Sequence, residues 1–592
     1  MLLNLPEDAW RSIAIHLPTP DILSFLSVHK NINNHLAKSS PSFWKQLLAI
    51  HRDEDIDTSS SNNDTNNTSS NTSTDIQDAR NEFMLQAYKS ALPKVKWIQL
   101  DINNTFPVSA REGHISCVLT GPENYKSLVI TGGFTDDEGI TVLSLPSGYK
   151  SHTKTWGWSR VMPESGCGAS FVYGASLTAL PPVDNTANNP NVHIAKAVRF
   201  GGFAGGGYSQ EVNEVWVLTI RDGELSDGML SQTASWERIT TRGATRPRAY
   251  HTATLINDRY LVVIGGMTEQ GSIIEETILD THTWTWIDLT LACKGEPRGR
   301  HGHSVVWDKR RDRLVMFGGG SGTDLLRSGS DNNEVFELKM NGVEIPSQLV
   351  KDEMWEWNKL HGDDTSGDDG DSSDDDDDEE YREDDSNEEE EDDAKKGDSD
   401  DDDDDDEEEE NSTSSNNDDT ITANRLSPTE SLCLGRCHNG MKIAPDTVLF
   451  MFGSGHPNTN GTLGYDLSTD SFIRPTVSGP LPMPRFTGVA SFLDTEGYVF
   501  VHGGYSTGEG AIKDIYLLDL APHLNRNFTS LDVDTNRRSN RAVESSDRDR
   551  IADGLGGGGN AILSRLLMQN LLGMIDAEEL QEMIARGGVN RL

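Results

Sequence analysis

The chain has 592 residues and a formal net charge of −45, and it is too long to fold around a single hydrophobic core. The charge is concentrated, because residues 361–420 hold 35 Asp and Glu against 3 Lys and Arg, a net of −32, which leaves −13 elsewhere. No basic patch favours nucleic acid, and no run of about 18 apolar residues predicts a membrane span. The odd, sparse set of 5 cysteines and the absence of a basic flank near residue 1 indicate a reduced compartment without secretion. We therefore expect a multidomain protein of the cytoplasm, the nucleus or both.

Residues 1–52 predict a small all-α module. Asp8 can cap a first helix, and Trp10, Ile13 and Leu17 then follow at the spacing of one helix face. Two prolines end this helix, and further apolar clusters continue to Leu48. So short a module buries little surface by itself, and we expect it to complete its core on a partner. The order of residues resembles the F-box, with Leu-Pro at 5–6, Ile-x-x-x-Leu-Pro at 13–18, Asp-Ile-Leu at 21–23 and Phe-Trp-Lys at 43–45.

The F-box resemblance implies a partner. F-box modules bind a Skp-type adaptor, which links them to a cullin and a RING subunit. The positions that match the adaptor-facing or module-defining residues of the family are Leu5, Pro6, Ile13, Leu17, Pro18, Ile22, Leu23 and Val28. The alternative is a generic amphipathic helical cap.

The next segments are predicted from composition. Residues 53–78 are Ser, Asn, Thr and Asp with almost no apolar side chain, which predicts a disordered linker. Apolar residues at positions 83, 85, 88 and 92 then predict a short helix over 79–92.

An internal repeat dominates the middle of the chain. Apolar strands end in a glycine pair at five places, and a degenerate copy, Phe450-Met-Phe-Gly453, lies between the last two. Most copies begin near an Arg and a His and continue into an aliphatic strand and a Trp. Such repetition predicts a mainly β fold built from similar units. The pairs are Gly132 and Gly133, Gly201 and Gly202, Gly265 and Gly266, Gly318 and Gly319, and Gly503 and Gly504.

The repeats resemble the kelch repeat, whose period is about 50 residues. The resemblance implies a six-bladed β-propeller over residues 93–521; counting the degenerate copy as a loop is the alternative. No Trp-bearing strand follows the last copy, so we expect Val95–Leu100 to complete the last blade and close the ring. The tryptophans predicted to pack between blades are Trp97, Trp158, Trp236, Trp286 and Trp357.

Several polar residues recur at equivalent positions of the repeats. Recurrence favours a structural role in each blade. The alternative is that these side chains line the channel mouth and bind the target protein, for instance an acidic segment of it. The residues are Arg111, His114, Arg248, His251, Arg300, His303 and Arg485.

Two further segments interrupt or follow the repeats. The polyanion over 361–425 predicts a disordered acidic insert, open to binding basic proteins or to phosphorylation. A polar stretch at 522–559 predicts a flexible linker. Apolar periodicity at 560–587 predicts a short C-terminal helical hairpin, which docks on the molecule or serves as a partner surface.

The sequence offers little for catalysis. Cys433, Cys437 and His438 are three candidate zinc ligands without a fourth, so we expect no metal and no cofactor. An F-box followed by kelch repeats is the layout of substrate receptors of SCF-type ubiquitin ligases, which perform no bond chemistry. The resemblance therefore implies a receptor that binds the Skp-type adaptor and a target protein, without direct contact to membrane or nucleic acid. The rivals are a kelch scaffold without ligase function, binding basic or chromatin proteins through the acidic insert, and a kelch-fold enzyme.

Deleting residues 363–419 should leave the melting temperature nearly unchanged. Like charges repel within this segment and it has little to bury, and longer loops cost little closure entropy. Thermal unfolding of the full chain and of the deletion variant by circular dichroism checks this. A large drop in melting temperature would mean that the insert is part of the fold.

Overall fold

The computed structural model describes residues 43–45, 47, 73–100, 531–533, 537–539 and most of 109–524. Within 109–524 the residues not described are 122–125, 136–138, 146–155, 166–171, 183–191, 205–209, 225–229, 289–294, 296, 323–332, 341–354, 363–423, 426–434, 455–460 and 495–496. The predicted adaptor-facing residues 5–28, most of the acidic insert and the predicted helices at 560–587 lie outside the described residues. Among the helices that are described, none has the length and apolarity to cross a membrane.

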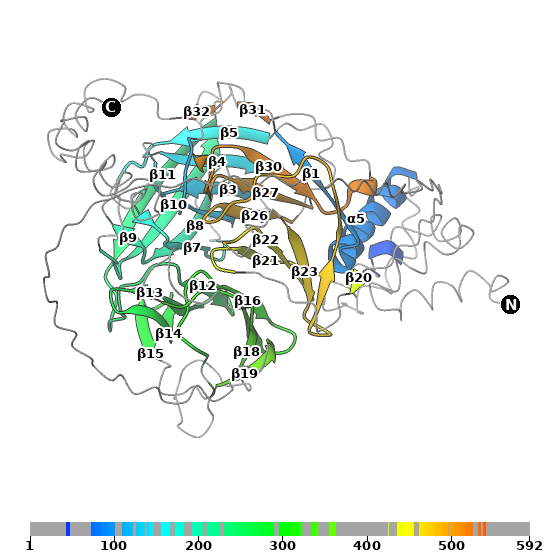
Figure 1. Ribbon diagram of the computed structural model, residues 1–592. Coiled ribbons are helices and arrows are strands. Elements are labelled where there is room, and N and C mark those ends of the chain that lie inside the picture. Colours follow the sequence, from blue (N-terminus) through cyan, green and yellow to red (C-terminus); the bar gives the residue numbers. More distant parts are fainter. Residues whose placement is uncertain are drawn as a thin grey trace, which may run out of the picture. The chain divides into compact units, whose positions relative to one another are not determined.

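Six antiparallel sheets follow one another as the blades of a β-propeller, which confirms the predicted fold class (Figure 1). Within each blade the strands follow one another from the inner to the outer edge. Blade 1 has β2 (Ile115–Thr120), β3 (Lys126–Thr131), β4 (Ile140–Leu145) and β5 (Trp156–Val161). Blade 2 has β7 (Ser176–Ala179), β8 (Val192–Phe200), β10 (Val215–Glu224) and β11 (Leu230–Ile239). Blade 3 has β12 (Thr252–Ile256), β13 (Tyr260–Thr268), β14 (Gly271–Asp280) and β15 (Thr285–Asp288).

The remaining three blades repeat the same order. Blade 4 has β16 (Ser304–Asp308), β17 (Arg313–Phe317), β18 (Val335–Lys339) and β19 (Glu356–His361). Blade 5 has β21 (Asn439–Ala444), β22 (Thr447–Met451), β23 (Thr462–Asp466) and β24 (Ser471–Arg474). Blade 6 has β26 (Val489–Leu493), β27 (Tyr498–His502), β30 (Ile515–Asp519) and, from the N-terminal side of the chain, β1 (Lys94–Gln99).

The ring closes through β1. This strand pairs antiparallel with β30, with Trp97 opposite Leu518, so the first strand of the propeller is the outer strand of its last blade. The predicted closure is therefore confirmed. Second-strand side chains are buried throughout blades 3 to 6 and, except for Lys126, in blade 1, and the predicted tryptophans lie in the outer strands.

The outer edges of blades 1, 2, 3 and 6 pair with the chain that leaves the preceding blade. After blade 5, β25 (Thr476–Ser478) pairs in parallel with β1, and after blade 6, β31 (Leu531–Val533) pairs in parallel with β5. Isolated parallel bridges pair Pro163, after blade 1, with Ala234 of blade 2, and Arg242, after blade 2, with Thr285 of blade 3. Pairing of this kind removes free strand edges, which would otherwise invite aggregation. We call these segments latches.

Two predicted segments are corrected by short strands of this kind. Residues 522–559 are not only a linker, because the short 3₁₀ helix η6 (Pro522–Leu524), β31 and β32 (Arg537–Ser539) lie within them, and β32 pairs with β11. The predicted insert 361–425 includes β20 (Asn424–Arg425), which pairs with β24. These strands are two or three residues long and lack apolar alternation, so a sequence pattern cannot reveal them.

The helix before the propeller is longer than predicted. It is α5 (Ser73–Ala91), so it takes up the last residues of the predicted linker as well as the predicted helix 79–92. Ser73 and Asp75 favour a helix start, because a hydroxyl caps free amides and a carboxylate stabilises the positive end of the helix. The helix ends where Leu92 adopts a φ of 45° and donates its amide to the Tyr88 carbonyl at 2.8 Å.

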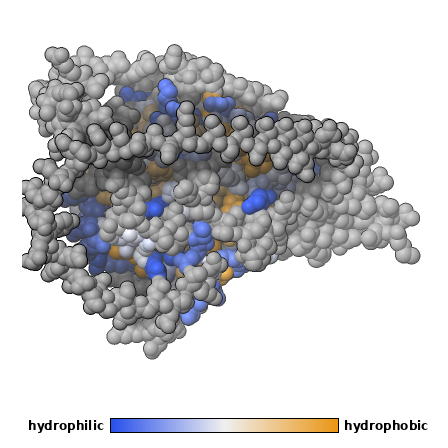
Figure 2. Space-filling model, in the orientation of Figure 1, coloured by the Kyte–Doolittle hydropathy of each residue, from blue (hydrophilic) through white to orange (hydrophobic). Residues whose placement is uncertain are grey.

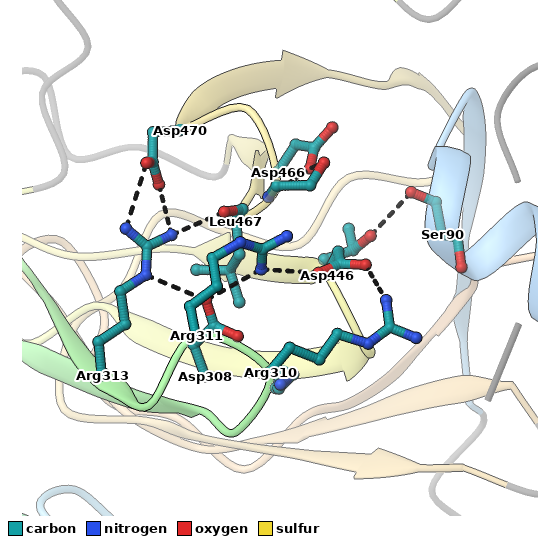
Figure 3. A network of polar contacts seen from close by, with 12 residues as sticks. Ser90, Asp308, Arg310, Arg311, Arg313, Asp446, Asp466, Leu467 and Asp470 are labelled. Carbon is teal, nitrogen blue, oxygen red and sulfur yellow. Dashed lines mark hydrogen bonds and ion pairs between the residues drawn. The ribbon is translucent and has the colours of Figure 1, made fainter. Parts of the chain in front are cut away.

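An ionic network joins blade 4 to the degenerate blade 5 (Figure 3). Arg313 lies at its centre and bonds Asp308 at 3.0 Å and Glu337 at 2.8 Å within its own blade. Across the junction it bonds Asp470 at 2.8 Å. Burial alone would lower the pKa of Arg313, but the hydrogen bonds to Asp470, Glu337 and Asp308 outweigh it and raise the pKa. Arg311 adds a bridge from Asp308 to Asp446, at 3.0 and 2.9 Å, so the network spans the junction where the acidic insert interrupts the chain.

Removing the C-terminal latch should destabilise blades 1 and 2. Truncation after Leu524 deletes β31 and β32, which leaves the outer strands β5 and β11 without these parallel partners. We expect a lower melting temperature and faster aggregation on heating, followed by scanning calorimetry and light scattering. Truncation after Asn540 keeps both strands and is the matched control; equal behaviour of the two truncations would contradict the role of the latch.

Candidate binding face at the channel mouth

The glycine pairs build a closed ring of hydrogen bonds between the blades. In each blade the amide of the second glycine donates to a main-chain carbonyl of the next blade, at the residue three positions before the recurrent His position. A left-handed φ is needed there, for example 111° at Gly266, and a Cβ at this glycine would lie 2.9 Å from the Ala249 carbonyl. The bonds are Gly133 to Val172 (2.8 Å), Gly202 to Arg248 (2.9 Å), Gly266 to Arg300 (2.9 Å), Gly319 to Gly435 (3.0 Å), Gly453 to Arg485 (3.1 Å) and Gly504 to Arg111 (2.8 Å).

A second series of main-chain bonds runs nearer the channel. The residue just before each recurrent His position has a positive φ, from 53° at Thr487 to 64° at Gly174. In blades 1 to 5 its amide donates to the carbonyl of its counterpart in the preceding blade. The bonds are Gly113 to Thr487 (2.9 Å), Gly174 to Gly113 (2.9 Å), Tyr250 to Gly174 (2.8 Å), Gly302 to Tyr250 (2.9 Å) and Cys437 to Gly302 (2.7 Å).

The recurrent arginines lie inside the blades. Each of Arg111, Arg248, Arg300 and Arg485 is fully buried and donates to the carbonyl of the first glycine of its own blade, at 2.9 to 3.2 Å. Three of them also pair with a carboxylate in the third strand or just before it: Arg248 with Glu275 at 3.1 Å, Arg300 with Glu334 at 3.0 Å, and Arg485 with Asp514. This favours the structural role. The alternative prediction, that these arginines bind the target, is not supported, because the guanidinium groups are used within the fold.

Two blades depart from the pattern. Blade 2 has Val172 where an Arg is expected, and Arg199 of β8 pairs with Glu214 instead, at 3.5 Å. In blade 5 the position is Gly435, and Arg436 stands one residue later. These substitutions explain why the sequence pattern weakens in both copies.

Blade 5 also replaces the first glycine by Phe452, whose φ is 63°. At the equivalent Gly265, a Cβ would lie 2.7 Å from the His303 ring of the next blade. The next blade after Phe452 has Gly488 at the His position, so no imidazole is in the way. Phe452 instead packs 5.9 Å from the Trp97 ring and beneath the Arg485 guanidinium at 5.4 Å.

The recurrent histidines connect neighbouring blades. His251 Nε2 lies 2.9 Å from the Ser176 hydroxyl of blade 2, and His303 Nε2 lies 3.2 Å from the Thr252 hydroxyl of blade 3. His114 Nε2 lies 3.1 Å from Nδ1 of His502 in blade 6. Burial, together with the nearby Arg248, lowers the pKa of His251 to about 3. These imidazoles are therefore neutral at pH 7.

The same segments surround a cavity of about 260 Å³ at the channel mouth. Every blade contributes lining residues, among them His114, His251, His303 and His438. The described lining includes no carboxylate, and no group of three or more His, Cys, Asp or Glu in the described part of the chain could hold a metal ion. Cys437 and His438 line the mouth; Cys433, the third candidate zinc ligand, lies outside the described residues.

The rim of the mouth differs from blade to blade. An apolar cluster there includes Tyr173 and Phe203 of blade 2, Met267 of blade 3, and Phe486 and Tyr505 of blade 6. At the position after the recurrent arginine, blades 2, 3 and 6 carry Tyr173, Ala249 and Phe486, whereas blades 1, 4 and 5 carry Glu112, His301 and Arg436. Hydrophilic and hydrophobic residues also lie side by side on the described surface shown in Figure 2.

Two large apolar side chains are exposed among the described residues. Leu481 is 53% and Met483 39% exposed, and both belong to the proline-rich segment that leads to Arg485 and the mouth residue Thr487. No pattern in the sequence singled them out. Apolar side chains held in water on a stiff segment are suited to contact a partner.

The propeller should lose stability already at mildly acidic pH. Above about pH 6.5 the mouth histidines are neutral both in the folded and in the unfolded chain, so their titration does not lower the free energy of unfolding. Below this pH the unfolded chain takes up protons, whereas the folded chain does not until about pH 3 at His251 and about pH 4 at His438. Stability therefore falls with pH in this window, by up to about 1.4 kcal/mol per unit for each histidine.

Urea unfolding between pH 7.5 and 5 measures how the free energy of unfolding changes with pH. This range lies above the pH at which most carboxylates titrate. The His251→Ala variant should show a shallower slope, since Ala175 already occupies the equivalent position in blade 2. Replacing the exposed His282 by Ala is the control. A native slope near zero would show that the histidines titrate normally.

Comparison with known proteins agrees with this architecture. The model of the KLHDC2/KLHL20/DRC7 Kelch-repeats domain matches residues 198–347, and the model of the F-box domain matches residues 2–44. Adagio protein 3 of Arabidopsis thaliana is 32% identical over 164 residues, which are 27% of this chain and 22% of that protein.

Other relatives share a similar stretch. Acyl-CoA-binding domain-containing protein 5 of Arabidopsis thaliana is 28% identical over 162 residues, 27% of this chain and 22% of the relative. Host cell factor of Drosophila melanogaster is 28% identical over 145 residues, 24% of this chain and 8% of the relative. The chain thus spans about a fifth or less of these relatives. With an F-box at its N-terminal end and a six-bladed propeller of kelch repeats after it, the chain is an F-box/kelch-repeat protein.

Proposed function

We propose that this protein is the substrate-recognition subunit of an SCF-type ubiquitin ligase. The F-box binds a Skp-type adaptor, and through it a cullin and a RING subunit, while the propeller binds the target protein. The observation that carries the proposal is the combination of the two matches in one chain, the F-box over residues 2–44 and the kelch repeats over 198–347.

The structure favours the channel mouth as the target-binding face. The inner strands of blades 5 and 6 begin at mouth residues such as His438 and Gly488, and they end at turns that contain Asp446 and Asp494. Helix α5, which follows the F-box in the chain, is bonded at those turns, at the opposite ends of the strands. A target at the mouth would therefore not compete with α5 for the same surface.

In this role the chain performs no bond chemistry. It raises the effective concentration of target lysines near the conjugating enzyme that carries ubiquitin. This contribution is one of proximity alone. The mouth histidines and the exposed Leu481 and Met483 are the side chains we propose for target contact.

The Leu17→Asp/Leu23→Asp double variant should no longer bind the adaptor, and its propeller should stay folded. Charges on the apolar face of the helical module oppose its burial against a partner. Capture of a Skp-type adaptor and a cullin by the full chain, compared with the variant, checks this; calorimetry of both proteins shows whether the propeller melts at the same temperature.

The outcomes separate the rival functions. Capture by the full chain and not by the variant supports the ligase receptor. Failure of the native chain to capture the adaptor contradicts the proposal and leaves the scaffold function, for which basic chromatin proteins would be the next ligands to try. Unfolding of the propeller in the variant would contradict the modular arrangement.

A further inference from the structure

Helix α5 has no exposed face over the residues whose side chains the structure describes. From Ala79 to Ala91 each residue is buried or half-buried, including the charged Lys89. A helix on the surface of a domain buries one stripe and exposes the other, whereas a helix covered all round lies between two partners. One of these partners is the propeller, and the contacts identify the other.

One face of α5 is fixed to blades 5 and 6. The side chain of Lys89 is 0% exposed, bonds Asp494 at 2.5 Å and lies 5.1 Å from the Phe492 ring centroid. The Ser90 carbonyl accepts a bond of 2.8 Å from the Thr447 hydroxyl. Just beyond the helix, Leu92 is fully buried in the core cluster of these two blades. The C-terminal end of α5 is therefore part of the propeller core.

Nearer to its N-terminal end, α5 carries Arg80 and Phe83, three residues apart and thus on one side of the helix. Phe83 packs against Trp44, with ring centroids 5.6 Å apart, and the Arg80 guanidinium lies 6.0 Å from the Trp44 ring. Trp44 and Phe83 are both fully buried. Trp44 belongs to the Phe-Trp-Lys segment at the end of the F-box match.

We propose that α5 is a rigid bridge that locks the F-box to the propeller, and that Phe43, Trp44 and Leu47 form an internal docking surface for α5 instead of contacting the adaptor. All three side chains are buried, whereas Lys45 between them is exposed. Phe83 contacts Trp44 and Lys89 bonds Asp494 of blade 6, so the helix itself connects the F-box segment to the propeller. The 19 residues of α5 set the separation of its two ends at about 28 Å.

The consequence rests on the proposed function. A receptor that holds its adaptor-binding module and its target-binding face as one body presents target lysines at a fixed place relative to the conjugating enzyme. A flexible linker of the same length would spread them over a larger volume and lower their effective concentration. The bridge therefore selects which lysines are modified.

Hydrogen exchange measured by mass spectrometry on the full chain tests the bridge without an adaptor. Trp44→Ala and Phe83→Ala remove the same contact from its two sides, and each should speed amide exchange over residues 80–91 by about tenfold or more. Phe83→Ala should also speed exchange over residues 43–47, because the coupling is reciprocal. Lys45→Ala is the matched control, and the strands of blades 1–4 should not change in any variant.

Adaptor capture by the same proteins gives the second readout. Both aromatic variants should still bind the adaptor as the native chain does. Unchanged exchange in α5, or loss of the adaptor in Trp44→Ala while Phe83→Ala keeps it, would overturn the inference and assign Trp44 to the adaptor surface. Where Trp44→Ala unfolds the F-box itself, the exchange and capture results of Phe83→Ala decide. Failure of the native chain to bind any adaptor would count against the ligase function alone, since the exchange result does not depend on it.

Discussion

One main-chain hydrogen bond, made six times, holds the propeller together. The amide of the second residue of each glycine pair can reach the next blade only with a left-handed backbone and without a side chain in the way. The arginines then serve this bond indirectly, since they hold the carbonyl of the first glycine of their own blade. These bonds also explain why the arginine charges can be buried around the channel. Each guanidinium bonds a main-chain carbonyl, and in blades 3, 4 and 6 it also pairs with a carboxylate. An unpaired buried charge at these places would cost several kcal/mol.

The glycine pairs and the tryptophans were enough to predict the six blades and the closure by Trp97, because both depend on residues that no other residue type replaces well. Blade 2 and blade 5 were harder to delimit, since Val172 and Gly435 stand where an Arg is expected and the contact is replaced elsewhere. The latch strands β31 and β32 and the first turn of α5 were missed. Their pairing depends on main-chain groups and on distant blades, and neither leaves a periodic signal in the sequence.

The candidate site was predictable only in part. The recurrence of Arg and His located the channel mouth, yet it could not distinguish side chains that line the cavity from those that support it. His251 and Arg248 are three residues apart in the sequence, and one faces the cavity whereas the other bonds two carbonyls inside the blade. The exposed Leu481 and Met483 were not predicted, because single apolar residues are common on protein surfaces and therefore give no signal in the sequence.

Blade 6 is made from two distant parts of the chain, β1 from before the acidic insert and β26, β27 and β30 from after it. A protease that cuts within residues 363–419 would therefore sever the polypeptide without separating the pieces. The two fragments would stay joined through the β1–β30 ladder, through the Arg313 network and through the glycine ring, as in a split protein that reassembles. The F-box match lies on the first fragment, and blade 5 with most of blade 6 lies on the second, so a nicked chain would keep the F-box and the complete propeller in one complex.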